Sequence, residues 1–263
     1  MEKAKPKVGI FGITGCQGCH LSILFIENIL LDIINNIDLQ VLPFVKEKNN
    51  LNAKYDIGII EGVVVSNEDI EIIKKVRENS EFLIALGTCA THGNVPAMKN
   101  FMNKKNVESV YKTTNHLDSI EPAPIDKYVK VDFYISGCPP DKNEIAEVFK
   151  SLFIGKKLSK FDNPVCYECA LKENNCLLYQ GKKCLGPLSR AGCGALCPSL
   201  NKDCTGCRGP IEDTNVTAMI NSLQERGIPV DLITDKINKF AALKYHEIMA
   251  NEKIKKEEKF ITE

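Results

Sequence analysis

Residues 7–19 have the sequence KVGIFGITGCQGC, an apolar run followed by a glycine-rich turn with two cysteines. A short apolar run bounded by turn residues is typical of a buried strand. The spacing of Cys16 and Cys19, directly after that strand, is typical of thiolates that bind a metal. We therefore expect the chain to begin with a strand whose carboxyl end carries part of a metal site.

Beyond this stretch, apolar strands alternate with amphipathic helices as far as about residue 155. Such alternation predicts an α/β fold, with a parallel sheet and helices on its faces. The predicted strands are residues 7–11, 39–45, 56–61, 81–86 and 129–135, and the predicted helices are residues 21–34, 67–79 and 140–153. Residues 91–127 are polar and rich in turn residues, so we expect them to form a surface excursion.

Two further cysteines follow predicted strands, Cys89 after the fourth and Cys138 after the fifth. The carboxyl ends of parallel strands meet at one edge of an open sheet, where diverging loops leave a crevice for ligands. Glycines accompany all four cysteines, and glycine lets backbone N–H groups approach anionic sulfur, although tight turns alone also favour glycine. We predict that Cys16, Cys19, Cys89 and Cys138 form one site, with Glu61 at the same edge.

Eight more cysteines lie in one irregular stretch, residues 161–210, which has many glycine and proline breakers. They are Cys166, Cys169, Cys176, Cys184, Cys193, Cys197, Cys204 and Cys207. A segment with so little helical or strand periodicity needs metal ligation to become ordered. We predict two sequential sites of four thiolates each.

The twelve cysteines are consistent with three chemistries. The sequence shows no apolar leader or twin arginine, so we expect a reducing, cytoplasmic setting, which disfavours a disulfide framework. Zinc usually takes its ligands from a compact local module, whereas the first four cysteines come from three distant segments. We therefore favour iron-sulfur clusters, with a zinc-binding scaffold as the alternative.

Charge and motifs exclude several other functions. Lys plus Arg and Asp plus Glu each total 34, and this balance predicts no nucleic-acid partner. The apolar run of residues 21–34 contains Glu27 and Asp32, which argues against direct membrane insertion. No nucleophile stands beside a base and no phosphate-binding loop is present. We expect a chain that carries no catalytic centre of its own and is not an enzyme alone.

The cysteine motifs, in their order, resemble the small electron-transfer subunit of cytoplasmic group 3 NiFe hydrogenases, with the sulfhydrogenase delta subunits as the nearest type. The motifs are Cys16-Gln17-Gly18-Cys19, Gly87-Thr88-Cys89-Ala90, Gly137-Cys138-Pro139-Pro140, Cys184-Leu185-Gly186-Pro187, Arg190-Ala191-Gly192-Cys193 and Cys204-x-Gly206-Cys207-Arg208-Gly209. The resemblance extends over residues 7–212.

This resemblance implies three domains and three 4Fe-4S clusters. Residues 1–155 would be a flavodoxin-like domain that holds the proximal cluster, residues 156–212 a two-cluster module, and residues 213–263 a C-terminal helical segment. The amphipathic pattern of that last segment itself predicts helices at 216–226, 230–243 and 245–259. The implied ligands are Cys16, Cys19, Cys89 and Cys138 for the proximal cluster, Cys193, Cys197, Cys204 and Cys207 for the medial one, and Cys166, Cys169, Cys176 and Cys184 for the distal one.

The same resemblance implies two partners, a NiFe hydrogenase large subunit and a flavoprotein or ferredoxin-like electron-transfer subunit. The function implied is an NAD(P)-linked sulfhydrogenase. The alternative is a methyl-viologen-type hydrogenase coupled to heterodisulfide reductase, since the tail lacks the ferredoxin-type spacing of deazaflavin-reducing members. A respiratory complex small subunit fits less well, because it typically has adjacent cysteines in the first motif and no eight-cysteine tail.

Several further residues remain candidates. Glu61 is a hydrogen-bonding neighbour of the first site, a proton carrier, a substitute ligand or merely a solvated carboxylate. His92 either donates an N–H to sulfur or caps a turn. Arg190 and Arg208 either offset cluster charge or form surface ion pairs. The Gly93-Asn94 pair stands where many relatives have a second glycine, and we expect it to alter the local turn.

Overall fold

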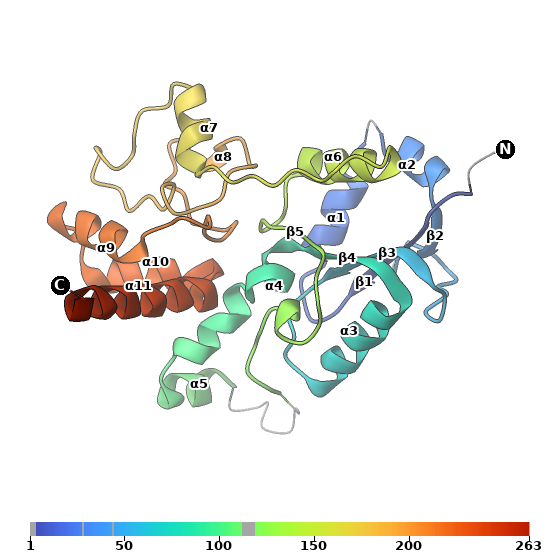
Figure 1. Ribbon diagram of the computed structural model, residues 1–263, viewed down its shortest axis with the longest axis horizontal. Coiled ribbons are helices and arrows are strands. Elements are labelled where there is room, and N and C mark those ends of the chain that lie inside the picture. The colour runs from blue at the N-terminus through green and yellow to red at the C-terminus, as the bar shows by residue number, and fades with distance from the viewer. Residues whose placement is uncertain (1–3, 28, 44, 112–118, 263) are drawn as a thin grey trace. The chain divides into compact units, whose positions relative to one another are not determined.

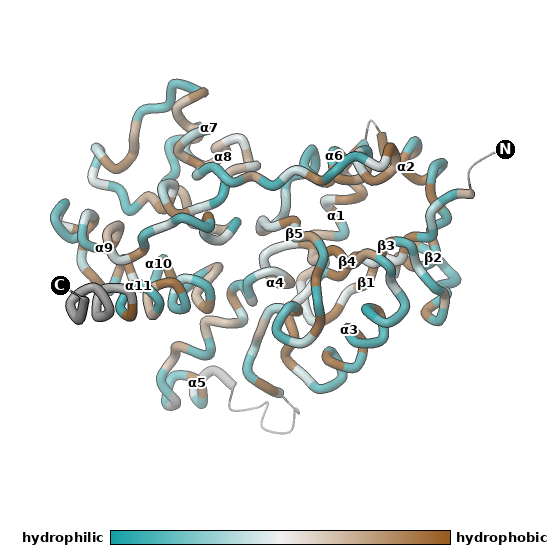
Figure 2. Tube along the Cα trace, in the orientation of Figure 1, coloured by the Kyte–Doolittle hydropathy of each residue, from teal (hydrophilic) through white to brown (hydrophobic). Residues whose placement is uncertain are grey.

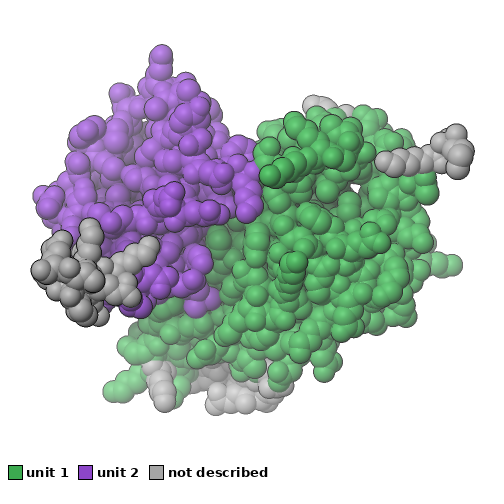
Figure 3. Space-filling view, in the orientation of Figure 1, with its two compact units in different colours: residues 1–159 green, residues 160–263 purple. Residues whose placement is uncertain are grey.

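The computed structural model describes residues 4–27, 29–43, 45–111 and 119–262. The chain forms two compact units, residues 1–159 and residues 160–263, which are coloured separately in Figure 3. No helix among the described residues is long and apolar enough to cross a membrane.

The first unit is built on a five-stranded sheet with the order β2-β1-β3-β4-β5 (Figure 1). The strands are β1 (Lys7–Gly12), β2 (Asp38–Val41), β3 (Tyr55–Glu61), β4 (Ser80–Leu86) and β5 (Phe133–Ile135). All neighbouring strands run parallel. This order is that of flavodoxin-like folds, so the predicted α/β class and the parallel sheet are confirmed.

Helices cover both faces of the sheet. Helices α1 (Gly18–Leu24), α2 (Leu30–Asn36) and α6 (Lys142–Phe153) pack with β1, β3 and β4 in one apolar core, whereas α3 (Asn67–Asn79) and α4 (Gly87–His92) pack into a second core. Figure 2 shows brown, apolar stretches in the strands and largely teal, hydrophilic stretches on α3. Helix α3 begins at a capping box, in which Ser66 and Asp69 satisfy each other's backbone N–H groups.

Three predictions about this unit are wrong in detail. The helix predicted over residues 21–34 is broken between Leu24 and Leu30, and its first part starts earlier, at Gly18. Apolar periodicity does not reveal the break, because Ile23 before it, Ile26 within it and Ile33 after it all enter the same core. The second and fifth strands are shorter than predicted.

The segment 91–127 is only partly a surface excursion. It contains the 3-10 turns η1 (Val95–Phe101) and η3 (Ile125–Lys127) and the helix α5 (Lys104–Tyr111), while residues 112–118 lie outside the described residues. Ala97, Ala123 and Ile125 are buried. Val64 and Ala123 exchange backbone hydrogen bonds at 3.0 Å in both directions, which brings the chain back to the sheet before β5.

The second unit combines short helices in loops with three longer helices. These are α7 (Val165–Leu171), α8 (Leu196–Ser199), α9 (Val216–Glu225), α10 (Val230–Phe240) and α11 (Ala242–Thr262). The three helices predicted near the C-terminus are therefore confirmed to within a few residues. Leu185 and Leu188 of the cysteine-rich stretch share an apolar core with α9, α10 and α11, so that stretch is ordered partly by packing against these helices.

Candidate metal centres

The carboxyl ends of four strands lie in one row. Gly12 pairs with Glu61, Glu61 with Leu86, and Leu86 with Ile135. Parallel neighbours are spaced by about 4.8 Å, so the loops that follow β1, β3, β4 and β5 start side by side at one edge. Cys16, Cys19, Cys89 and Cys138 all belong to the segments that leave this edge.

The first pair of cysteines is placed by the turn into α1. Gln17 adopts the left-handed conformation with φ of 62° and lets the helix begin at Gly18. Cys16 is exposed and Cys19 is buried. Glu61 Oε2 accepts a hydrogen bond from the backbone N–H of Cys19 at 3.2 Å, and Glu61 is only 2% exposed. The solvated-carboxylate interpretation of Glu61 is therefore wrong.

The segments of Cys89 and Cys138 are joined by hydrogen bonds. Thr88 donates its backbone N–H to Gly137 O and accepts the Gly137 N–H at its hydroxyl oxygen, each at 3.0 Å. The side-chain amide of Asn94 donates to Cys89 Sγ at 3.1 Å and to Cys138 Sγ at 3.4 Å. One buried donor thus serves two sulfurs that are 49 residues apart in the chain (138 − 89).

The thiols of this group influence one another electrostatically. Burial raises the pKa of the Cys89 thiol to about 11, although the Asn94 hydrogen bond acts against it, and Cys138 and Cys16 add to the rise. Burial also raises the pKa of Cys19, with further contributions from Glu61, Cys89 and Cys16. Thiols with such pKa values keep their protons at neutral pH unless a bound cation stabilises the thiolates.

A second group of thiols lies on and after α7 in the second unit. Burial raises the pKa of Cys166 to about 12, and the neighbouring Cys184, Cys169 and Cys176 raise it further. A Cβ atom at Gly186 would lie 3.2 Å from Cys166 Sγ and 3.5 Å from Cys184 Sγ. These four cysteines are therefore neighbours in space.

The remaining cysteines form a third group, carried by the loop before α8, α8 itself and the loop after it. Burial raises the pKa of Cys204, to which Cys184, Cys207 and Cys193 contribute. Burial also raises the pKa of Cys197, and among the charged neighbours Cys193 raises it most. The second and third groups adjoin, because the backbone N–H of Cys204 donates to Cys184 Sγ at 3.3 Å.

Arg208 brings a buried positive charge to the third group. It is 2% exposed, and its Nε donates to Ala191 O at 2.7 Å. The pKa of Cys193 is raised by burial and by Glu168, and the Arg208 charge lowers it in part. The surface-ion-pair interpretation of Arg208 is therefore wrong.

The three groups fit iron-sulfur clusters by the chemistry of their donors. Each group offers four thiols, and backbone or amide N–H groups already point at several sulfurs, as cluster sulfurs require. A Cβ at Gly87 would lie 2.2 Å from Cys19 Sγ, so glycine is needed there for space. Within the described residues, no three His, Cys, Asp or Glu side chains surround a position for a single metal ion. In a four-iron cluster, each thiolate binds a different iron.

Other residues show where sequence reasoning was incomplete. Asn94 was expected only to alter a turn, and its φ of 50° shows an unusual backbone, but its contact with two sulfurs was missed. Glu168, which lies between Cys166 and Cys169, was missed altogether. His20 is buried, and burial lowers its pKa. His92 ends α4 and is partly buried, and its contact with sulfur stays a prediction.

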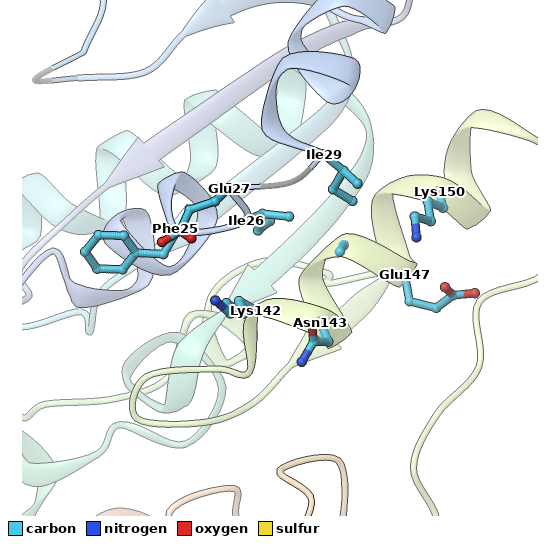
Figure 4. A pocket seen from close by; sticks show the side chains of 9 residues that line it. Phe25, Ile26, Glu27, Ile29, Lys142, Asn143, Glu147 and Lys150 are labelled. Atoms are coloured by element: carbon cyan, nitrogen blue, oxygen red, sulfur yellow. The ribbon is translucent and has the colours of Figure 1, made fainter.

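A pocket in the first unit lies apart from these groups (Figure 4). It lies where the chain passes from α1 to α2 beside α6. Its lining is Phe25, Ile26, Glu27, Ile29, Lys142, Asn143, Ala146, Glu147 and Lys150. This lining contains no cysteine and mixes charges of both signs, so the pocket is not a thiolate site.

The chain is similar to known oxidoreductases. The family model described as NADH ubiquinone oxidoreductase, 20 Kd subunit, matches residues 16–152, just over half of the chain. The delta subunit of sulfhydrogenase 2 from Pyrococcus furiosus is 38% identical over 237 residues, which cover 89% of this chain and 99% of that protein. One subunit of the F420-non-reducing hydrogenase vhu from Methanocaldococcus jannaschii is 31% identical, and the match covers 95% of this chain and 98% of that protein.

Solved structures agree with the fold. A chain of an NAD+-reducing [NiFe]-hydrogenase in the H2-reduced state superimposes with a TM-score of 0.53 at 27% identity, covering 59% of this chain and 95% of that one. A Ni-Fe-Se hydrogenase chain from Desulfomicrobium baculatum has a TM-score of 0.56 at 17% identity, covering 80% and 96%, and supports the fold alone. The chain therefore belongs to this oxidoreductase family, in which it is an electron-transfer small subunit of the NiFe hydrogenase type.

Proposed function

We propose that this subunit relays electrons through three 4Fe-4S clusters between the Ni-Fe site of a large subunit and a flavoprotein or ferredoxin-like partner. The proximal ligands are Cys16, Cys19, Cys89 and Cys138, the medial ligands Cys193, Cys197, Cys204 and Cys207, and the distal ligands Cys166, Cys169, Cys176 and Cys184. The observation that carries this proposal is the row of strand ends, which gathers four thiols from three distant segments.

The role of the chain's own residues follows from their contacts. Bound clusters would supply one-electron transfer, and the protein sets the conditions for it. Glu61 and Thr88 fix the loops that present Cys19 and Cys89. Asn94 donates to two proximal sulfurs, and Arg208 places positive charge beside Cys193. These residues orient the thiolates and offset their negative charge.

Exposed cysteines in each unit suit the docking of partner proteins. Cys16 and Cys138 are exposed in the first unit, and Cys176 is exposed in the second. Leu21 on α1 and Phe25 directly after it are about half exposed, at 48% and 54%. An electron carrier needs such openings, since transfer between proteins requires close approach of their redox groups. We therefore assign the face around Cys16 and Cys138 to the large subunit and retain the cytoplasm as the compartment.

Two versions of the proposed function differ in the partner that exchanges electrons with this subunit. The NAD(P)-linked version agrees with the similarity to a sulfhydrogenase delta chain and to a chain of an NAD+-reducing [NiFe]-hydrogenase. The methyl-viologen-type version, coupled to heterodisulfide reductase, agrees with the similarity to a hydrogenase chain that is named as F420-non-reducing. The zinc-scaffold alternative predicts a colourless protein without inorganic sulfide.

Anaerobic purification of the tagged chain from its own cells tests the proposal. We expect a brown complex that contains a nickel-bearing large subunit, takes up hydrogen and reduces NAD(P). Recovery of a heterodisulfide reductase subunit in place of a nicotinamide-binding flavoprotein would select the second version. A colourless preparation that contains zinc and no large subunit would overturn both versions.

A further inference from the structure

Tyr245 lies in a setting that its packing alone does not explain. It is the fourth residue of α11 (Ala242–Thr262), and its side chain is 1% exposed within the core shared with α9 and α10. Among the described residues, its hydroxyl has no hydrogen-bond partner. A phenylalanine would fill the same core without a buried hydroxyl that lacks a partner, which is unfavourable. The buried hydroxyl therefore needs a hydrogen-bond acceptor.

The hydroxyl faces the loop between two medial cysteines. Its oxygen lies 3.2 Å from the position that a Cβ atom at Gly206 would occupy. Gly206 stands between Cys204 and Cys207 with φ of +72°, and its backbone N–H already donates to Cys204 Sγ at 3.5 Å. The tyrosine thus brings a second polar hydrogen to the loop between Cys204 and Cys207.

The charges near Tyr245 fix it as a donor. Burial raises the pKa of the Tyr245 hydroxyl above its usual range, and Cys204 and Cys207 raise it further. A tyrosine hydroxyl, with an ordinary pKa of about 10, keeps its proton at neutral pH. A neutral hydroxyl beside anionic sulfur donates its hydrogen bond to that sulfur.

We propose that the Tyr245 hydroxyl donates a hydrogen bond to a sulfur of the group held by Cys193, Cys197, Cys204 and Cys207, and thereby sets its reduction potential. The proposal rests on the proposed function, since it requires a cluster at the medial position. Hydrogen bonds to cluster sulfurs are among the factors that set potentials. A donor favours the more negative, reduced state, so Tyr245 raises the medial potential. The C-terminal helix α11 thereby acquires a role beyond packing.

The test compares two Tyr→Phe variants of the anaerobically purified complex. Tyr245→Phe removes only the hydroxyl under study. The control is Tyr55→Phe in the first unit, where the hydroxyl donates to Asn50 O at 2.7 Å and contacts no cysteine. Redox titration followed by electron paramagnetic resonance gives the potential of each cluster, and loss of one signal in Cys197→Ala identifies the medial one.

In Tyr245→Phe, we expect the equilibrium constant for medial reduction to fall about tenfold, which is about 59 mV for one electron. The proximal and distal potentials stay unchanged, and Tyr55→Phe changes none of the three. A medial potential that is equal in wild type and Tyr245→Phe would overturn the inference while leaving the proposed function intact. Absence of any signal that depends on Cys197 in the wild type would instead overturn the proposed function.

A second measurement on the same three proteins looks for the hydroxyl proton itself. After exchange of the wild-type complex into D2O, electron-nuclear double resonance detects deuterons close to the reduced medial cluster. We expect one such coupling to be present in wild type and Tyr55→Phe and absent in Tyr245→Phe. If wild type and Tyr245→Phe gave the same set of couplings, the hydroxyl would not reach the cluster sulfur.

Discussion

The carboxylate of Glu168 accepts a hydrogen bond from the backbone N–H of Gly192 at 2.8 Å. Its other oxygen accepts from the N–H of Ala195 at 3.1 Å. Glu168 lies on α7 between Cys166 and Cys169, whereas Gly192 and Ala195 lie on either side of Cys193. Gly192, Gly194 and Ala195 all have positive φ. The loop therefore adopts a backbone conformation that requires stabilising hydrogen bonds. Glu168 links the two proposed cluster sites of the second unit.

Replacement of Glu168 tests this link. Glu168→Ala removes both acceptors, and we expect the loop of Cys193 to release its cluster, so that iron falls from about twelve to about eight per chain. Glu168→Gln keeps one acceptor oxygen and should retain most of the iron. Glu225→Ala, an exposed glutamate on α9, is the matched control. Full iron content in Glu168→Ala would show that the link is dispensable.

The amide of Asn94 should raise the potential of the proximal cluster. Asn94→Gly removes the amide and also relieves the backbone at φ of 50°, so folding is not at risk. Because the donor to Cys89 and Cys138 is lost, we expect a more negative proximal potential in a redox titration. The medial and distal potentials serve as internal controls. A proximal potential equal to that of wild type would contradict this role.

Gly87 is needed for space beside sulfur as well as for its backbone conformation. In Gly87→Ala, the new Cβ would lie 2.2 Å from Cys19 Sγ, and the residue would keep φ of +83°. We expect loss of the proximal cluster, measured as about four irons per chain. Gly181→Ala has a similar φ of +72° with no atom within 4 Å, so it suffers only backbone strain of about 1–2 kcal/mol. Equal iron content in both variants would contradict the steric argument.

Asp132 stabilises the sheet in a pH-dependent way. Burial alone would raise its pKa, but hydrogen bonds from Arg77 and the Leu83 N–H, with the Arg77 charge, lower the pKa overall. A lowered carboxyl pKa gives stability that is present above the unfolded value of about 3.9 and is lost as the pH falls through the folded value. Asp132→Asn should lower the free energy of unfolding at pH 7 by about 2 kcal/mol, measured by anaerobic urea unfolding.

The pH profile distinguishes this effect from a general loss of packing. The difference between wild type and Asp132→Asn should shrink below about pH 4, where the carboxylate becomes protonated. Asp38→Asn, at an exposed position in β2, should change the stability little at any pH. A difference between wild type and Asp132→Asn that stays constant down to pH 2 would contradict the ion pair with Arg77.

Local patterns in the sequence predicted the structural elements that depend on local apolar periodicity. The run of residues 7–11 and its counterparts gave the parallel sheet, and the position of cysteines after strands placed four thiols at one edge. The break between α1 and α2 escaped prediction, since Ile23 and Ile33 both enter the core. The contacts of Asn94 and Glu168 also escaped, because each reaches across the fold to a partner distant in sequence. The burial of Glu61 and Arg208 depends on tertiary packing in the same way.

The iron content of Cys16→Ala and Cys138→Ala tests the central claim most directly, which is that thiolates distant in sequence share one cluster. The account predicts about twelve irons and about twelve sulfides per chain for the anaerobically purified wild type. Each single variant should lose the same cluster and retain about eight irons, with the medial and distal signals intact. An iron-free wild type, or a full iron content in either variant, would contradict the account.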